Sequence, residues 1–174
     1  NGPLYRKLSA AIHADLAIFS SHLPLDLHPE VGNNAVLAAK LGMAPTTPLA
    51  ENKGPSIGLV ADMNIPREEL FTRLEKITGH SPHLAPGADE TCRRVALITG
   101  GAGREVYKIA AQNIDTFITG EGTHDTFTAA EELRINLFYA GHYATETFGV
   151  KALCAHLEEN FKIPWQFIDH PSGL

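Results

Sequence analysis

The chain has 174 residues, of which 44% are apolar and 20% charged, the balance of a folded globular protein rather than a disordered one. Its net charge is −6, and its 14 Lys and Arg residues are scattered along the chain, which argues against nucleic-acid binding. No apolar run approaches the roughly 20 residues of a membrane-spanning helix. We therefore expect a cytoplasmic protein that makes no membrane contact.

Helix-like and strand-like runs alternate along the chain. In chain order we expect helix 4–14, strand 16–21, helix 33–41, strand 56–63, helix 66–78, strand 95–99, helix 104–112, strand 116–119, helix 126–134, strand 135–140, a long final helix from about 141 to 161 and a closing strand 164–168. This order predicts an α/β fold, with a mainly parallel or mixed sheet and helices on both faces, in one unit spanning 1–174.

Two softer stretches, 43–55 and 79–90, are rich in proline and are expected to be loops. His80 and His83 in the second loop have metal-like spacing, but they lack neighbouring carboxylates or cysteines and make a poor cage.

Cys92 and Cys154 lie far apart without a CxxC motif, which argues against a zinc ribbon or a disulfide framework. Cys154 falls on the apolar face of the final helix. We expect this face to pack against the core beyond the first turn of the helix, and Cys154 to be buried there.

The segment 141–146 reads Gly-His-Tyr-Ala-Thr-Glu and follows an apolar strand. His142 and Glu146 are four residues apart, so a helix that begins near Gly141 places both side chains on one face of its first turn. An imidazole and a carboxylate are metal ligands, although the same pair also occurs on ordinary solvated helix faces. A second cluster, 21–26, places His22 and Asp26 after the predicted strand 16–21, and strand ends are where α/β proteins locate their chemistry.

Residues 119–125 read Thr-Gly-Glu-Gly-Thr-His-Asp and follow a third predicted strand. Glu121 and His124 are candidates for substrate contact or proton transfer, whereas Asp125 or Thr123 could cap the next helix and His124 could be a surface residue. The glycine-rich run 99–103 lies between a strand and a helix and could surround a phosphate. It lacks the full dinucleotide and P-loop patterns, and a tight turn that needs glycine is the alternative.

Taken in order, the motifs at 21–26, 32–34, 119–121 and 141–146 resemble those of the NGG-interacting-factor-like dinuclear metal-centre family, many of whose members are named GTP cyclohydrolase I type 2 homologues. The resemblance runs from about Leu4 to the C-terminus. It implies that Asp26 and His142 are metal ligands and that Glu146 is a carboxylate ligand bridging two metals. His22 is expected close by as a supporting group or occasional ligand, and Glu121 and His124 beside the metals.

The resemblance implies two divalent ions, and mixed imidazole and carboxylate ligands suit zinc, iron, manganese, cobalt or nickel. Two bridged ions would generate hydroxide from water at neutral pH, so we expect a metal-dependent hydrolase of GTP cyclohydrolase type acting on a nucleotide or another small molecule. The alternative is a metal-binding regulatory or protein-interaction module without turnover. The resemblance also implies a homo-oligomer, a hexamer with its sites facing an internal cavity.

One feature of the family pattern is missing. The family's other ligands are an adjacent His-His pair upstream of the first motif, and no such dipeptide occurs in these 174 residues. The chain opens at Asn1, and its first helix has no preceding strand, so we expect an N-terminally truncated member that holds fewer than two ions unless ligands come from outside it.

Overall fold

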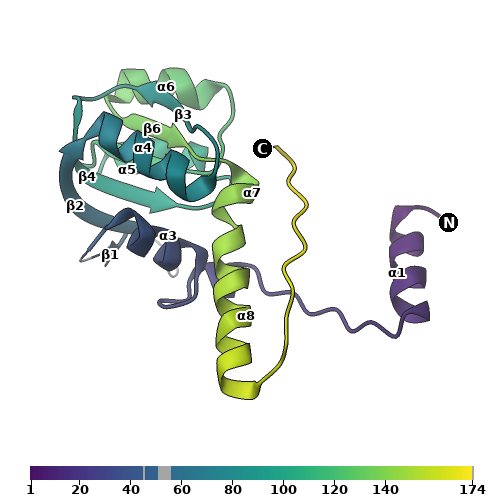
Figure 1. Cartoon of the computed structure of the whole chain (residues 1–174). Helices are drawn as coiled ribbons and strands as arrows, with labels where there is room; N and C mark the ends of the chain where they lie inside the picture. Colours follow the sequence, from purple (N-terminus) through teal and green to yellow (C-terminus); the bar gives the residue numbers. More distant parts are fainter. Residues whose placement is uncertain (45, 51–55, 174) are drawn as a thin grey trace.

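The computed structural model describes residues 1–44, 46–50 and 56–173. It has the expected α/β fold, built on a six-stranded mixed sheet in the order β1-β2-β4-β5-β6-β3 (Figure 1). Strands β4, β5 and β6 are parallel, whereas β1, β2 and β3 pair antiparallel with their neighbours. The elements are α1 (Pro3–His13), α2 (Leu23–Asp26), α3 (Asn33–Leu41), β1 (Thr47–Pro48), β2 (Leu59–Pro66), α4 (Arg67–Thr78), β3 (His83–Pro86), β4 (Thr91–Ile98), η1 (Gly103–Glu105), α5 (Val106–Ala110), β5 (Thr116–Thr119), α6 (Asp125–Leu133), β6 (Asn136–Tyr139), α7 (His142–Thr145) and α8 (Thr147–Phe161).

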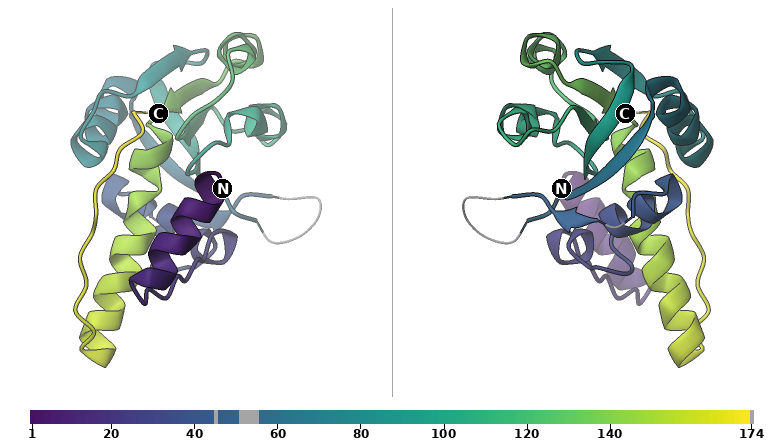
Figure 2. Two further views of the ribbon diagram at one scale, coloured as in Figure 1. Left: turned by 90° about the vertical axis from the view of Figure 1, so that its right-hand side faces the viewer. Right: turned by 90° about the vertical axis from the view of Figure 1, so that its left-hand side faces the viewer.

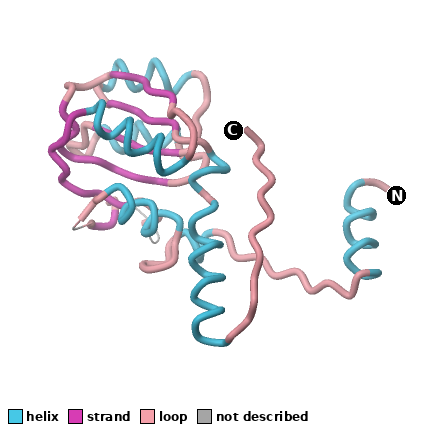
Figure 3. The backbone as a smooth tube through the Cα atoms, viewed as in Figure 1, coloured by secondary structure: helices cyan, strands magenta, loops and turns pink. Residues whose placement is uncertain are grey.

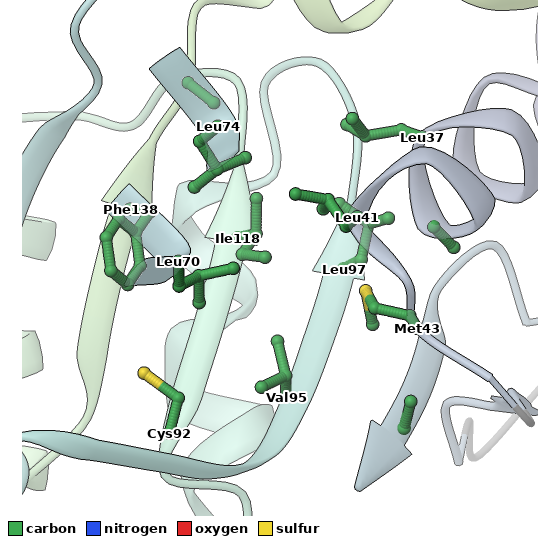
Figure 4. Packing of buried hydrophobic residues seen from close by; sticks show 13 residues of the cluster. Leu37, Leu41, Met43, Leu70, Leu74, Cys92, Val95, Leu97, Ile118 and Phe138 are labelled. Carbon is green, nitrogen blue, oxygen red and sulfur yellow. The ribbon is translucent and has the colours of Figure 1, made fainter. Parts of the chain in front are cut away.

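Helices cover both faces of the sheet, because the central strands are apolar on both sides. Alternate residues of β4 belong to two different clusters: Val95 and Leu97 pack with α3 and α4, whereas Ala96 and Ile98 pack with α5 and α6. This is the pattern of a strand buried on both faces. Figure 4 shows the first cluster, with leucines from α3 and α4 meeting side chains of the sheet.

The three parallel strands end at the same edge of the sheet, and their following loops are hydrogen-bonded to one another. The backbone N–H of Gly120 donates to the carbonyl of Gly100 at 2.8 Å, and that of Gly141 donates to the carbonyl of Gly120 at 2.8 Å. This edge is where parallel α/β sheets form their binding crevices. The loops after β4, β5 and β6 therefore bring three of the predicted motifs side by side.

Two predicted strands are wrong. Residues 16–21 and 164–168 are extended, but neither pairs with a strand in the parts of the chain that the structure describes (Figure 3). The first leaves Ile18 72% and Phe19 88% exposed. Without a neighbouring edge to satisfy its N–H and C=O groups, β-type sequence remains solvated coil. The second runs back along α8 (Figures 1 and 2).

Two predicted loops contain strands. The stretch 79–90 includes β3, which pairs with β6, and 43–55 includes the short β1, although residues 45 and 51–55 of it lie outside the described residues. Both strands contain proline and lie at the two edges of the sheet, where a missing N–H donor is tolerated. Their proline content therefore led to a loop prediction for both segments.

The final helix is broken at Glu146, which ends α7 and precedes α8 with φ −104° and ψ 7°. Beyond this break, only Thr147 and Gly149 of α8 are buried. The prediction that the rest of the helix is packed is therefore wrong for its distal half, where Phe161 is 66% exposed. Cys154 is only partly buried, whereas Cys92 lies in the core.

Candidate metal centre

Asp26 is the most buried of the predicted ligands and is oriented by the amide of Asn33. It lies at the end of α2 with 7% of its surface exposed. Its Oδ1 accepts a hydrogen bond from Asn33 Nδ2 at 2.7 Å, and Asn33 Oδ1 in turn accepts from the backbone N–H of Gly149 at 2.6 Å. The amide of Asn33 thus connects Asp26 to α8, the helix that directly follows Glu146.

Asp26, Glu146 and His22 meet at one point. One donor atom from each lies within 4.8 Å of the other two, and His22 Nε2 is 3.9 Å from Asp26 Oδ2. Their exposure is graded: Asp26 is buried, the Glu146 side chain is 30% exposed and that of His22 76%. An imidazole and two carboxylates at this separation can surround one divalent cation and leave coordination positions open toward solvent.

His142 lies on the other side of Glu146. Its Nε2 is 3.3 Å from Glu146 Oε2, and its Nδ1 is 2.8 Å from Glu121 Oε1. A carboxylate on one ring nitrogen fixes the tautomer and directs the other nitrogen toward a metal, as in carboxylate–histidine–metal arrangements. Burial lowers the pKa of His142, but the Glu121 hydrogen bond and the charges of Glu146 and Glu121 outweigh it, so this pKa lies above its ordinary value of 6.5.

The glycine-rich loop after β4 forms part of this site for steric reasons. Gly100 has φ +72°, and a Cβ there would collide with Glu146 Oε1, while a Cβ at Gly101 would lie 3.3 Å from the His142 ring. The backbone N–H of Gly100 donates to Thr145 Oγ1 at 3.0 Å. The glycines of the run 99–103 thus allow this backbone to approach Glu146 and His142 closely, which is a steric role rather than a phosphate-binding one.

Three cavities follow one another along the site. The first is lined by residues that include His22, Asp26 and Glu146, the second includes Glu146, His142 and Glu121, and the third includes Glu121 and His124. Glu146 is shared by the first two cavities and Glu121 by the last two. Their volumes are about 290, 470 and 460 Å³ in that order.

The structure brings five of the six predicted residues into one continuous group around Glu146. His124 is the exception: it is exposed at the start of α6 in the third cavity. Asn33 and Thr145 were not singled out from the sequence. An asparagine after glycine at a helix start and a threonine inside the His-Tyr-Ala-Thr-Glu string were the available signals.

With this geometry, comparison with known proteins is informative. The model of the DUF34/NIF3 family (NGG1p interacting factor 3) matches residues 1–172. The chain belongs to this family. A protein of Deinococcus radiodurans named GTP cyclohydrolase 1 type 2 homolog is 40% identical over 99% of the chain, which spans only 66% of that relative.

Two solved structures superimpose closely on this chain. TTHA1606 from Thermus thermophilus is 40% identical, with a TM-score of 0.90 over 100% of this chain and 69% of its own. The protein ybgI, described as of unknown function, is 35% identical, with a TM-score of 0.91 over 99% of this chain and 69% of its own. The chain therefore spans about two thirds of the length of these relatives. Over that length it shares their architecture.

Proposed function

We propose that this chain provides most of a divalent-metal centre of a hydrolase that acts on a nucleotide or a related small molecule. The observation that supports the proposal most strongly is the convergence of donor atoms from His22, Asp26 and Glu146 within 4.8 Å of one another, with His142 beside them. Two carboxylates this close repel each other, and a bound cation would relieve that repulsion.

The donor set fits the proposed ion. His22, Asp26 and Glu146 would hold one ion, and His142 with Glu146 would serve a second, with Glu146 between the two. This differs from the expected ligand set in giving His22 a direct role. Mixed nitrogen and oxygen donors favour zinc, iron, manganese, cobalt or nickel. An ion there would supply activation of water as a nucleophile at neutral pH.

The remaining residues would orient the site and the substrate. Glu121 holds the His142 ring through Nδ1, and Asn33 holds Asp26. The second cavity, beside His142 and Glu146, is also lined by Phe167, Ile168 and His170 of the C-terminal segment. The relatives' name, GTP cyclohydrolase 1 type 2 homolog, favours a purine nucleotide as substrate and hydrolytic opening of its ring.

The experiment is a turnover assay with GTP, followed by chromatography and by loss of guanine absorbance, at increasing concentrations of Zn²⁺, Mn²⁺ or Fe²⁺. We expect metal-dependent turnover that falls at least 100-fold in Glu146→Ala. The matched control is Glu159→Ala, which removes an exposed carboxylate further along α8. Turnover that is independent of metal, or equal in the two variants, would refute the hydrolase proposal.

A second candidate function is a metal-binding interaction module without turnover. The observation that favours it is the apolar N-terminal arm, residues 1–21, in which Leu4, Ile12 and Phe19 are 69%, 76% and 88% exposed. Apolar exposure of this extent marks surfaces that contact other proteins. A homo-oligomer, with a hexamer as the family precedent, would cover it. Oligomer formation without GTP turnover is the result that this alternative predicts.

A further inference from the structure

The third cavity is lined by aromatic rings from three different elements. Besides Glu121 and His124, it contains His83 from β3, Phe127 from α6 and Tyr139 from β6. Its volume of about 460 Å³ lies in the range of small-molecule sites. It adjoins the proposed metal centre through Glu121, and the chemistry described above leaves it unused.

Two of the three rings, His83 and Tyr139, project from paired strands of the sheet. His83 and Tyr139 are directly opposite each other in the β3–β6 pair, with ring centroids 5.9 Å apart and an interplanar angle of 27°. The Phe127 ring lies 5.6 Å from that of His83. Tyr139 is anchored by a 2.7 Å hydrogen bond between its hydroxyl and Thr126 Oγ1. Fixed rings of this kind present π-faces to a flat ligand at little entropic cost.

Gly122 completes the shape of the cavity. A Cβ at this position would lie 2.7 Å from Tyr139 Cε1 and 2.5 Å from Thr126 Oγ1. A side chain here would therefore press on the tyrosine ring, and glycine lets the loop after β5 lie directly against it. The loop thereby brings the Glu121 carboxylate and the aromatic rings to the same cavity.

Glu121 supplies the cavity with a carboxylate that can accept hydrogen bonds. Glu121 Oε1 contacts His142 Nδ1, and no hydrogen bond to Glu121 Oε2 occurs among the described residues. A carboxylate oxygen at the end of an aromatic pocket is complementary to a ring N–H or amino group. The ligand class that combines a flat apolar face with such an edge is a nitrogen heterocycle.

We propose that the cavity of His83, Phe127 and Tyr139 binds the aromatic heterocycle of the substrate, with an N–H edge at Glu121 and the rest of the molecule directed past Glu121 toward His142 and Glu146. The proposal rests on the function proposed above and names the part of the substrate that gives selectivity. It assigns substrate-binding roles to three residues that lie outside the candidate metal ligands.

Calorimetric titration with guanosine, 1-methylguanosine and ribose tests the proposal, both with chelator and with Zn²⁺ present. Stacking of a base on an aromatic side chain contributes about 1–3 kcal/mol to the binding free energy. We therefore expect guanosine binding about tenfold weaker in Phe127→Leu and in His83→Ala. The control Tyr107→Leu removes an exposed ring on α5 and should bind as the wild type does. 1-Methylguanosine, which lacks the ring N–H, should bind less tightly, and ribose should not bind.

Three results would overturn the proposal: no guanosine binding to the wild-type protein in either condition, equal affinity in all variants, or ribose binding as tight as that of guanosine. Melting temperatures of the variants show whether each is folded. The two proposals can fail separately. If the wild-type protein binds guanosine but Glu146→Ala does not change the metal content, the metal centre alone is refuted. Metal-dependent turnover with a KM that Phe127→Leu does not change refutes the heterocycle pocket alone.

Discussion

At the scale of single residues, the proposed metal centre depends on groups that orient Asp26 and Glu146 as well as on these carboxylates themselves. Asn33 uses both ends of its amide, donating to Asp26 and accepting from the backbone of Gly149. Gly100 lets the backbone approach Glu146. The Asn33 hydrogen bond directs the Asp26 carboxylate, and orientation of this kind is what a metal site requires.

Replacing Asn33 with alanine should weaken metal binding about tenfold, because Asp26 loses its orienting donor. The backbone N–H of Gly149 also loses its acceptor, so the free energy of unfolding should fall by about 1–3 kcal/mol. Metal titration and chemical denaturation measure the two effects. The control is Asn160→Ala, which removes an exposed amide on α8 that donates to the His156 carbonyl; both quantities should stay near their wild-type values.

Gly100→Ala should abolish metal binding while costing only about 1–2 kcal/mol of stability. The new Cβ would collide with the flexible end of Glu146, which can swing away and take its ligand oxygen with it. Gly79→Ala is a matched control: it also has a positive φ, +83°, but no atom within 4 Å of the added Cβ. Equal metal content in the two variants would contradict the steric role of Gly100.

At the scale of elements, the C-terminal segment 162–173 packs along α8 without joining the sheet. Trp165 Nε1 donates to Glu158 at 3.0 Å, Lys151 Nζ lies 4.0 Å from the centre of the Phe167 ring, and the Tyr143 hydroxyl donates to Asp169 at 2.7 Å while accepting from the N–H of His170 at 2.8 Å. These contacts are exposed and individually weak. Together they place Phe167, Ile168 and His170 at the second cavity.

Tyr143→Phe should loosen this segment without unfolding the protein. It removes both hydrogen bonds of the hydroxyl from a solvent-accessible position, so the unfolding free energy should change by less than about 1 kcal/mol. Hydrogen exchange of the His170 amide, which donates to the Tyr143 hydroxyl, should become at least several-fold faster. In the control Tyr107→Phe, on α5, exchange of this amide should match the wild type; unchanged protection in Tyr143→Phe would show that other contacts hold the segment.

The helices and central strands could be predicted from sequence because they satisfy local rules. The apolar strands β5 and β6 lie within the predicted ranges, β4 begins at Thr91 rather than at 95, and α4 ends at Thr78 as expected. The edge strand β3 was missed because proline and glycine surround it, and 16–21 was wrongly predicted because its β-type composition says nothing about whether a partner strand is present.

The site was predicted in part for the same reason. His142 and Glu146 are four residues apart, so local geometry alone brings them together. The meeting of Asp26 with Glu146, 120 residues later, depends on α2, α3 and α8 packing against one another and was expected only from the family resemblance. The contact between Asn33 and Gly149 is equally long-range, and no periodicity predicts it.

At the scale of the whole molecule, the N-terminal arm exposes much apolar surface: α1 stands apart from the sheet (Figure 1) and has no buried residue. No helix that the structure describes is both long and apolar enough to cross a membrane. The proposed homo-oligomer would bury Leu4, Leu8 and Ile12, which lie on one face of α1. Burial of such side chains stabilises association by about 1.5–3 kcal/mol each when complete.

Light scattering should therefore give a mass of at least two chains of 18.8 kDa. Leu8→Lys should lower that mass by placing a charge in the apolar contact. Ala10→Lys adds the same charge to an exposed position on another face of α1 and should leave the mass unchanged. A wild-type mass of one chain would contradict the oligomer.

The central claim is that His22, Asp26 and Glu146 form a metal centre, and metal content per chain tests it most directly. Elemental analysis of the purified protein, alongside Glu146→Ala and the control Glu159→Ala, should give at least about one equivalent of zinc, iron, manganese, cobalt or nickel in the wild type and in the control, and close to none in Glu146→Ala. Metal near zero in all three proteins, or a content that Glu146→Ala does not change, would contradict the account.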